Sequence, residues 1–341
     1  MTVNEGNAVV KRRYDALDGL RAFSATGIVM MHVLANGNYA LQGFVFQQLI
    51  PSFTDLVFLF MIISGFSVCC GYYDKFQNGS ISFGAFYKKR FWKVWPFFAL
   101  LCVIDVGMSP SLRSVAEAFL NMTLLFGLIP NVEISVIGVG WFLGVVFVFY
   151  LLFPFVCWLL SDKKRAWFAF AIALLLNVVS NRFFGMERRS FIYSAVYFLA
   201  GGFIFLYKES VGAFVRRGRW LIALLAVIPA VCYYMIGRYT PILLVLFALL
   251  LIYALDGEGK YIVLSNPVTR FLSSISMEIY LCHMVAFRLM EKLGLTRVFQ
   301  SDLWSFLFAF VGTFVGAIIF SVLVSKALGF AGKRIRRKDI A

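Results

Sequence analysis

The sequence predicts an all-α polytopic membrane protein with about ten transmembrane helices and both termini in the cytoplasm. Of its 341 residues, 61% are hydrophobic and 14% are charged, whereas soluble domains average about 45–50% apolar and about 25% charged residues. Apolar runs of about 20 residues, long enough to cross a bilayer as helices, recur along the whole chain. These two observations exclude a soluble globular protein.

One of the apolar runs differs from the others. Ten are predicted to span the membrane, at residues 14–36, 51–73, 91–108, 137–160, 166–180, 191–207, 219–236, 239–255, 271–290 and 303–328. The run at 115–130 is short, contains Glu117 and Asn121, and ends at Pro130. It is predicted to form a re-entrant or interfacial helix on the outer side of the membrane.

The basic residues predict the orientation of these helices. Cytoplasmic loops carry an excess of lysine and arginine, and the strongly basic segments are VVKRRY, YKKRFWK, SDKKR, VRRGR and GKRIRRKD. All of them reach the same side only when residues 115–130 do not cross the membrane. Both termini are then cytoplasmic, with a short tail at 1–13 and a basic tail at 329–341.

The chain is predicted to be a single membrane-embedded domain, residues 1–341, in the cell (inner, cytoplasmic) membrane. No segment between the apolar runs reaches the roughly 50 residues that a second domain needs. The net charge of +15 is explained by basic cytoplasmic loops in contact with the lipid bilayer, so no nucleic-acid partner is expected. The six cysteines lie in apolar stretches without metal-ligand or disulfide spacing and are interpreted as packing residues.

The first apolar run carries Arg21 and His32 on one helical face. Eleven residues correspond to about three turns, so the two side chains are in phase and about 16 Å apart along the axis. Asp18 lies one turn before Arg21 and could orient its guanidinium. Ionisable groups within a span line a cavity or pathway by default, although Arg21 as an interfacial anchor and His32 as a hydrogen-bonded core residue are the alternatives.

The only other histidine of the chain, His283, lies in the run at 271–290. Counted along the helices, His283 and His32 both fall in the outer half of the bilayer, so the two are expected to approach each other. Glu278 in the same run needs a partner, and Arg288 or an internal water channel are the candidates.

Five sequence blocks occur in a fixed order between residues 14 and 290. They are LDGLRAFSATGIVMMH from residue 17, FLFMIISGFSV from 58, KKRFWKVWP from 88, WFLGVVFVFYLLFP from 141 and SISMEIYLCH from 274. Each block is weak alone, but the ordered set resembles the acyltransferase-3 family of integral membrane O-acyltransferases. The family's usual architecture agrees with the ten spans inferred from charge.

The sequence also departs from the family pattern. Val146 stands where the family usually has a glutamate, and Phe58 where an acid often precedes the phenylalanine-rich run; the nearest carboxylate there is Asp55. Lys93 replaces a common arginine and Met277 a common tyrosine. These changes leave the acyl-transfer assignment standing and indicate a divergent branch or a different acceptor.

The resemblance implies transfer of an acyl group, commonly acetyl from acetyl-CoA, to a hydroxyl of a cell-surface or lipid-linked carbohydrate. No tightly bound cofactor and no metal are expected, and acetyl-CoA or another acyl-CoA is the co-substrate. An alcohol needs a base with a pKa near 7, and His32 is the predicted general base. Arg21 is predicted to clamp the anionic coenzyme, and His283 to position the acceptor or share a proton.

Further residues are predicted to bind the coenzyme or the acceptor. Each kind of residue also has an explanation that involves no ligand. The basic residues could be an ordinary positive-inside flank, the aromatic residues could lie at the membrane interface or in the core, and Ser64-Gly65 could allow close helix packing. The predicted binding residues are Asp18, Arg21, Lys88, Lys89, Arg90, Lys93, Ser64, Trp141, Tyr150 and Glu278.

A second hypothesis belongs to a different functional class. A transporter or flippase for a polar or lipid-linked glycan could use Arg21, His32, Glu278 and His283 as a proton relay. The sequence shows no inverted repeat and no matched pair of broken helices, which many secondary transporters have.

Overall fold

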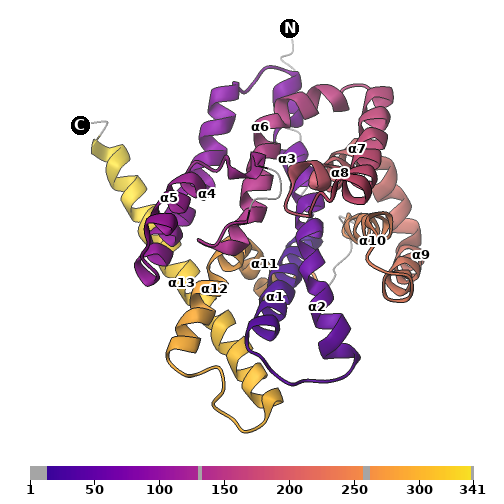
Figure 1. The fold of residues 1–341 in the computed structure, drawn as a ribbon. Helices are drawn as coiled ribbons and strands as arrows, with labels where there is room; N and C mark the ends of the chain where they lie inside the picture. Colours follow the sequence, from indigo (N-terminus) through magenta and orange to yellow (C-terminus); the bar gives the residue numbers. More distant parts are fainter. Residues whose placement is uncertain (1–13, 130–132, 256–261, 339–341) are drawn as a thin grey trace.

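The computed structural model describes residues 14–129, 133–255 and 262–338, and within these ranges all its regular secondary structure is helical (Figure 1). The predicted all-α class is therefore confirmed. The predicted tail at 1–13 lies outside the described residues, as do residues 339–341. The last helix continues through Lys338.

Each apolar run of the sequence falls on a helix. The main helices are α1 (Ala16–Asn36), α3 (Leu56–Gln77), α4 (Phe83–Met108), α6 (Trp141–Leu160), α7 (Lys163–Phe184), α8 (Phe191–Leu206), α9 (Lys208–Met235), α10 (Thr240–Tyr253), α12 (Ser276–Lys292) and α13 (Asp302–Lys338). Shorter elements connect them: η1 (Val45–Leu49), α2 (Ile50–Ser52), η2 (Phe53–Asp55), α5 (Leu112–Met122), η3 (Phe126–Leu128), η4 (Gly138–Gly140) and α11 (Pro267–Ser274).

Six stretches of the described residues are long and apolar enough to cross a membrane. They are Val45–Gln77, Phe83–Met108, Gly138–Leu160, Lys163–Phe184, Lys208–Met235 and Asp302–Phe330. Two more helices, α8 and α10, are apolar but shorter. The protein is therefore a multi-pass membrane protein, and the number of ten spans stays a prediction.

Contacts at the two ends of α1 show that α1 and α12 run in the same direction. Near the start of α1, the Ser273 hydroxyl donates to Asp18, while beyond the end of α1 the Tyr39 hydroxyl donates to the carbonyl of Thr296 at 2.9 Å. We call the end where α1 begins the proximal end and the opposite one the distal end. The end of α13 lies toward the proximal end, and the loops after α1 and before α13 lie at the distal end, at the bottom of Figure 1.

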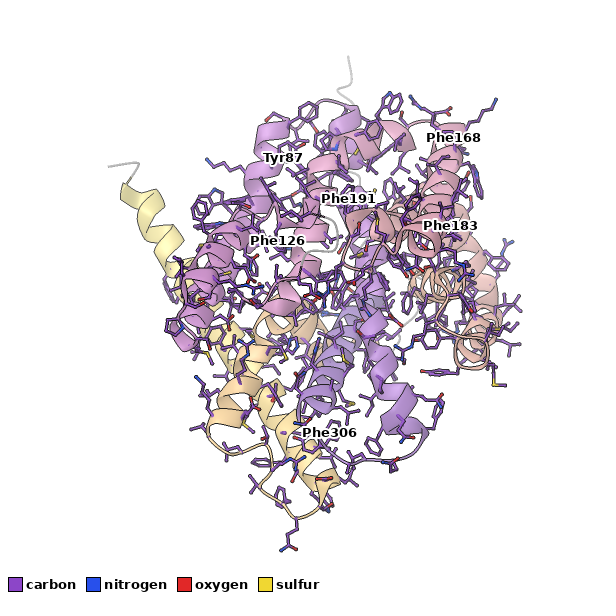
Figure 2. All side chains as sticks on the ribbon, viewed as in Figure 1. Tyr87, Phe126, Phe168, Phe183, Phe191 and Phe306 are labelled. Atoms are coloured by element: carbon purple, nitrogen blue, oxygen red, sulfur yellow. The ribbon has the colours of Figure 1, made fainter. Side chains whose placement is uncertain are left out.

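Helix α3 is the buried centre of the bundle, and it packs on α8 at van der Waals distance. A Cβ atom on Gly65 would lie 2.2 Å from the carbonyl oxygen of Phe198, and one on Gly201 would lie 2.1 Å from that of Ile62. The predicted role of Ser64-Gly65 in close helix packing is thus confirmed for the glycine. At the periphery, Phe168 and Phe183 of α7 point away from the bundle (Figure 2) and are 70% and 75% exposed, as suits side chains in lipid.

The run at 115–130 folds as the short helix α5, followed by η3. Its 11 residues extend about 16 Å, half of the bilayer's hydrocarbon thickness. Glu117 and Asn121, which made this run a poor candidate for a membrane span, bind a neighbouring segment. Glu117 accepts hydrogen bonds from the backbone N–H groups of Ser135 and Val136. The Asn121 amide donates to the Val136 carbonyl at 2.9 Å. A non-spanning helix is confirmed, and its place at the outer surface stays a prediction.

The sequence predicted one continuous helix over residues 271–290, and this prediction is wrong. The helix breaks at Ile275, whose φ of −120° and ψ of 15° are not helical. On either side of the break, the hydroxyls of Ser274 and Ser276 donate to the carbonyls of Phe271 and Ser273. Serine bonds of this kind compete with the helical pattern, which is why apolar periodicity alone overestimated the helix.

Replacing Gly65 by alanine is expected to destabilise the protein by about 1–3 kcal/mol, because the added methyl group meets backbone that cannot move independently. Thermal unfolding in detergent measures the loss. Gly71 lies on the same helix, and a Cβ atom added there would have no atom within 4 Å, so Gly71→Ala is the matched control and should be neutral or slightly stabilising. Equal effects of the two substitutions would contradict the close α3–α8 contact.

Candidate functional site

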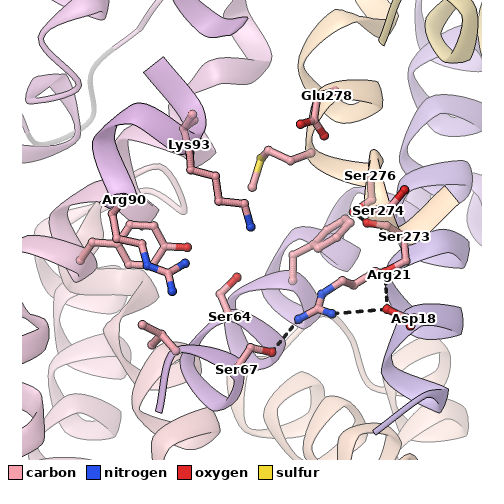
Figure 3. Close-up of a pocket in the computed structure, with 15 residues that line it drawn as sticks. Asp18, Arg21, Ser64, Ser67, Arg90, Lys93, Ser273, Ser274, Ser276 and Glu278 are labelled. Carbon is pink, nitrogen blue, oxygen red and sulfur yellow. Dashed lines mark hydrogen bonds and ion pairs between the residues drawn. The ribbon is translucent and has the colours of Figure 1, made fainter. Parts of the chain in front are cut away.

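A polar pocket opens at the proximal end, between α1, α3, α4, α6 and the break before α12 (Figure 3). Its volume is about 430 Å³. The lining residues are Asp18, Arg21, Phe60, Ser64, Ser67, Val68, Arg90, Lys93, Val94, Tyr150, Ser273, Ser274, Ser276, Met277 and Glu278. Seven of the predicted site residues therefore meet in one cavity, although the sequence places them on five separate helices.

Arg21 is held in the pocket by groups from three helices. Its guanidinium donates to the Ser67 hydroxyl at 2.6 Å and lies 3.8 Å from Asp18, and Asp18 in turn accepts from the Ser273 hydroxyl at 2.7 Å. The predicted orientation of Arg21 by Asp18 is present. Ser67 and Ser273 were not predicted, although Ser67 lies one helical turn after Ser64 and so faces the same side of α3.

Arg90 enters the pocket between two aromatic rings. Its guanidinium carbon lies 4.5 Å from the centre of the Tyr72 ring and 5.2 Å from that of Tyr150. Cation–π contacts of this kind fix the plane of the fork without consuming its hydrogen-bond donors, and Nε of Arg90 is buried without a partner. Arg90 can therefore donate to an anion in the cavity.

The remaining basic residues of the KKRFWK block divide between the pocket and the exterior. Lys93 points into the cavity opposite Glu278 (Figure 3). Lys88 and Lys89 are exposed and do not line it, because residues one or two positions apart on a helix face different directions. Within the lining, three cationic side chains face two carboxylates, so the pocket favours an anion.

The expectation that Glu278 pairs with Arg288 is wrong. Ten residues of helix separate them by about 15 Å, so Glu278 faces the proximal pocket while Arg288 reaches Asp105 near the distal end of α4. Glu278 lines the polar pocket, and the alternative of an internal water channel stays a prediction.

The two histidines meet deeper in the bundle, as expected. Their ring centres are 5.0 Å apart, and His283 is fully buried. Nδ1 of His283 lies 2.7 Å from the carbonyl oxygen of Tyr280, and because a carbonyl only accepts, Nδ1 carries the hydrogen and Nε2 keeps its lone pair. Nε2 is buried and has no hydrogen-bond partner within the described residues, so His283 can accept a hydrogen bond.

Three aromatic rings separate the pocket from the histidine pair. Tyr280 lies one turn before His283, with ring centres 6.1 Å apart, and it contacts Phe60 at 6.4 Å and Phe142 at 5.2 Å. Phe60 also lines the pocket. These three rings, Phe60, Phe142 and Tyr280, form an aromatic layer that joins the pocket lining to His283.

The segment that leads into α6 is fixed by buried polar groups. Asp105 accepts from the backbone N–H of Ile137 at 3.1 Å and pairs with Arg288, and the Tyr280 hydroxyl donates to the carbonyl of Val139 at 2.7 Å. Ile137 has a φ of 50°, a strained value for a β-branched residue that surrounding contacts must maintain. This anchoring sets the position of Trp141, the first residue of α6.

Arg188, which sequence reasoning missed, lies outside the proximal pocket, beside the starts of α3 and α6. It pairs with Asp55 at 3.4 Å and lies 5.6 Å from the centre of the Trp141 ring. Trp141 is thus part of this distal cluster and does not line the proximal pocket. The sequence did hold a signal for Arg188, because arginine is disfavoured in a segment that the charge pattern places outside the cell.

A family model described as an acyltransferase domain matches residues 14–325. The chain belongs to the acyltransferase-3 family. No curated protein and no solved structure matches it. Family membership confirms the resemblance carried by the five sequence blocks and makes the protein a membrane acyltransferase. Two departures from the family pattern, Phe58 and Val146, are buried at 1% and 0% exposure, so apolar packing occupies both positions.

Replacing Arg288 by alanine in this acyltransferase is expected to cost about 1–3 kcal/mol of folding free energy, because Asp105 stays buried without its cation. Unfolding in detergent measures the loss. The control is Arg270→Ala, whose partner Asp15 lies 3.6 Å away in a pair about half exposed on both sides and should lose about 0–1 kcal/mol. Similar losses in the two variants would show that the Asp105 pair does not anchor the segment before α6.

Proposed function

We propose that this acyltransferase moves an acyl group, commonly acetyl, from acyl-CoA to a hydroxyl of a cell-surface or lipid-linked carbohydrate. The observation that carries the proposal is that one aromatic layer joins a cationic pocket to a pair of neighbouring histidines. The proposed cellular location is the inner (cytoplasmic) membrane, with the proximal end and both termini facing the cytoplasm.

The proximal pocket is suited to the phosphates of coenzyme A. Arg21 and Arg90 offer planar forks for phosphate oxygens, and Lys93 adds a mobile point charge. Asp18 holds Arg21, and its charge together with that of Glu278 leaves the lining with one excess cation. With the proximal end in the cytoplasm, the pocket opens where acyl-CoA is available.

The distance between the pocket and the histidines matches an extended donor. Arg21 and His32 are about 16 Å apart along α1, so a coenzyme with its phosphates at Arg21 needs a long, slender arm to bring the thioester to His32. The pantetheine arm of coenzyme A has this shape. Phe60, at the inner end of the pocket, borders its path.

The histidine pair supplies the acid–base chemistry. His32 takes the proton of the acceptor hydroxyl as its oxygen attacks the thioester carbonyl, and the carbon–sulfur bond breaks as the ester bond forms. The proton then passes to the departing thiolate, which leaves as the free thiol of coenzyme A. Nε2 of His283 is placed to accept a hydrogen bond from His32 or from the acceptor, which orients the group that gives up its proton.

Binding of coenzyme A to the pocket gives a direct test. The detergent-purified protein should gain about 2.7 kcal/mol of stability at a ligand concentration a hundredfold above Kd, and Arg90→Ala should lose most of this gain. Lys164→Ala, which removes an exposed cation of α7 at the same end of the bundle, is the control and should retain it. No stabilisation of the wild-type protein would favour the glycan transporter, which has no coenzyme site.

A further inference from the structure

The distal cluster brings together side chains from four elements beyond the histidine pair. Asp55 ends η2, Arg188 precedes α8, Tyr233 lies near the end of α9, and Trp141 begins α6. Trp141 directly precedes Phe142, whose ring lies 5.2 Å from that of Tyr280, and the Tyr280 ring lies 6.1 Å from that of His283. The cluster therefore adjoins the aromatic layer next to the histidine pair, and none of its four residues lines the donor pocket.

Asp55 and its partners hold the guanidinium of Arg188 in one orientation. Arg188 Nη1 lies 3.4 Å from Asp55 Oδ1, and Nη2 donates to the carbonyl of Thr54 at 2.6 Å. The second carboxylate oxygen of Asp55 accepts from the Tyr233 hydroxyl at 2.6 Å. Asp55 is buried, whereas the Arg188 side chain is 32% exposed, so the fork can still donate outward.

Two aromatic rings flank the same guanidinium. Its carbon lies 5.4 Å from the centre of the Phe58 ring and 5.6 Å from that of Trp141. Phe58 is buried at 1% exposure, while Trp141 is partly exposed. The part of the cluster open to a ligand is thus an oriented guanidinium fork beside an indole ring.

This combination of groups selects the chemistry of its ligand. A fork of parallel N–H donors matches two neighbouring hydroxyl oxygens, and an indole ring packs against the apolar C–H face of a sugar. Asp55 pairs with Arg188, so the fork itself offers hydrogen bonds without an unpaired charge, while the further cation Arg238 lies 5.8 Å from the centre of the Tyr233 ring. The proximal pocket differs, because its cations outnumber its carboxylates.

We propose that Arg188 and Trp141 form the acceptor subsite and bind an uncharged sugar ring through its hydroxyls, with Asp55 and Tyr233 as positioning residues. This inference rests on the proposed function, because it brings the acceptor hydroxyl to His32 from a site separate from the pocket of the acyl donor. It also gives a reason for an arginine at the distal end, where the positive-inside rule disfavours one.

The test uses membranes from the native host, which contain the acceptor, and measures incorporation of label from [14C]acetyl-CoA into base-labile esters. Arg188→Lys and Trp141→Leu should each lower incorporation at least about tenfold, because they remove the fork and the flat ring. The acetyl-CoA concentration for half-maximal rate should stay unchanged. Arg189→Ala, the control, removes a neighbouring arginine paired at 3.9 Å with the exposed Glu133 and should transfer normally.

Competition identifies the ligand class in the same assay. Methyl glucoside should inhibit wild-type transfer more strongly than methyl glucuronide, which differs by a carboxylate. Normal incorporation by both variants at equal protein levels, or stronger inhibition by the glucuronide, would overturn the acceptor subsite while leaving the transferase standing. Absence of incorporation by wild-type membranes would overturn the proposed function itself, and the subsite with it.

Discussion

The high cost of an unpaired charge inside an apolar bundle is the constraint on which the site depends. Three aspartate–arginine pairs satisfy it: Asp18 with Arg21, Asp55 with Arg188, and Asp105 with Arg288. The first joins α1 to α3 and α11 through two serines, the second joins η2 to the start of α8, and the third joins α4 to α12. The pairs that keep charges compatible with the membrane also fix the helices around the two histidines.

The site has two polar regions separated by an aromatic layer. On the proximal side, cations converge on a pocket of about 430 Å³; on the distal side, a balanced Arg188–Asp55 pair lies beside Trp141. The His32 and His283 rings are 5.0 Å apart, and the His283 ring lies 6.1 Å from that of Tyr280 in the aromatic layer. This division suits the proposed transfer from a thioester to a hydroxyl, because the reacting atoms must meet while bulk water is kept from the thioester.

The sequence predicted the parts of this structure that depend on local pattern. Apolar runs located the helices, and helical spacing placed Asp18 beside Arg21. Hydropathy did not predict the break at Ile275, because this break depends on serine hydroxyls that compete for backbone carbonyls. Contacts between distant residues were also hard to predict. Arg188 was missed because its partner Asp55 is 133 residues away, and a single sequence gives no measure of such pairing. The approach of His32 to His283 was predicted from their similar depth counted along two helices, which a regular rise per residue makes accessible.

The central claim is that His32 catalyses acyl transfer to a glycan hydroxyl, and deletion of the gene in its native host tests it most directly. Mass spectrometry would compare base-labile O-acyl groups on surface glycans of the wild type, the deletion strain, and strains rescued with the wild-type gene or with His32→Ala expressed at the same level. The account predicts that one acyl group disappears on deletion and returns only with the wild-type gene. An unchanged acylation pattern with glycans accumulating inside the cell, or full restoration by His32→Ala, would contradict it.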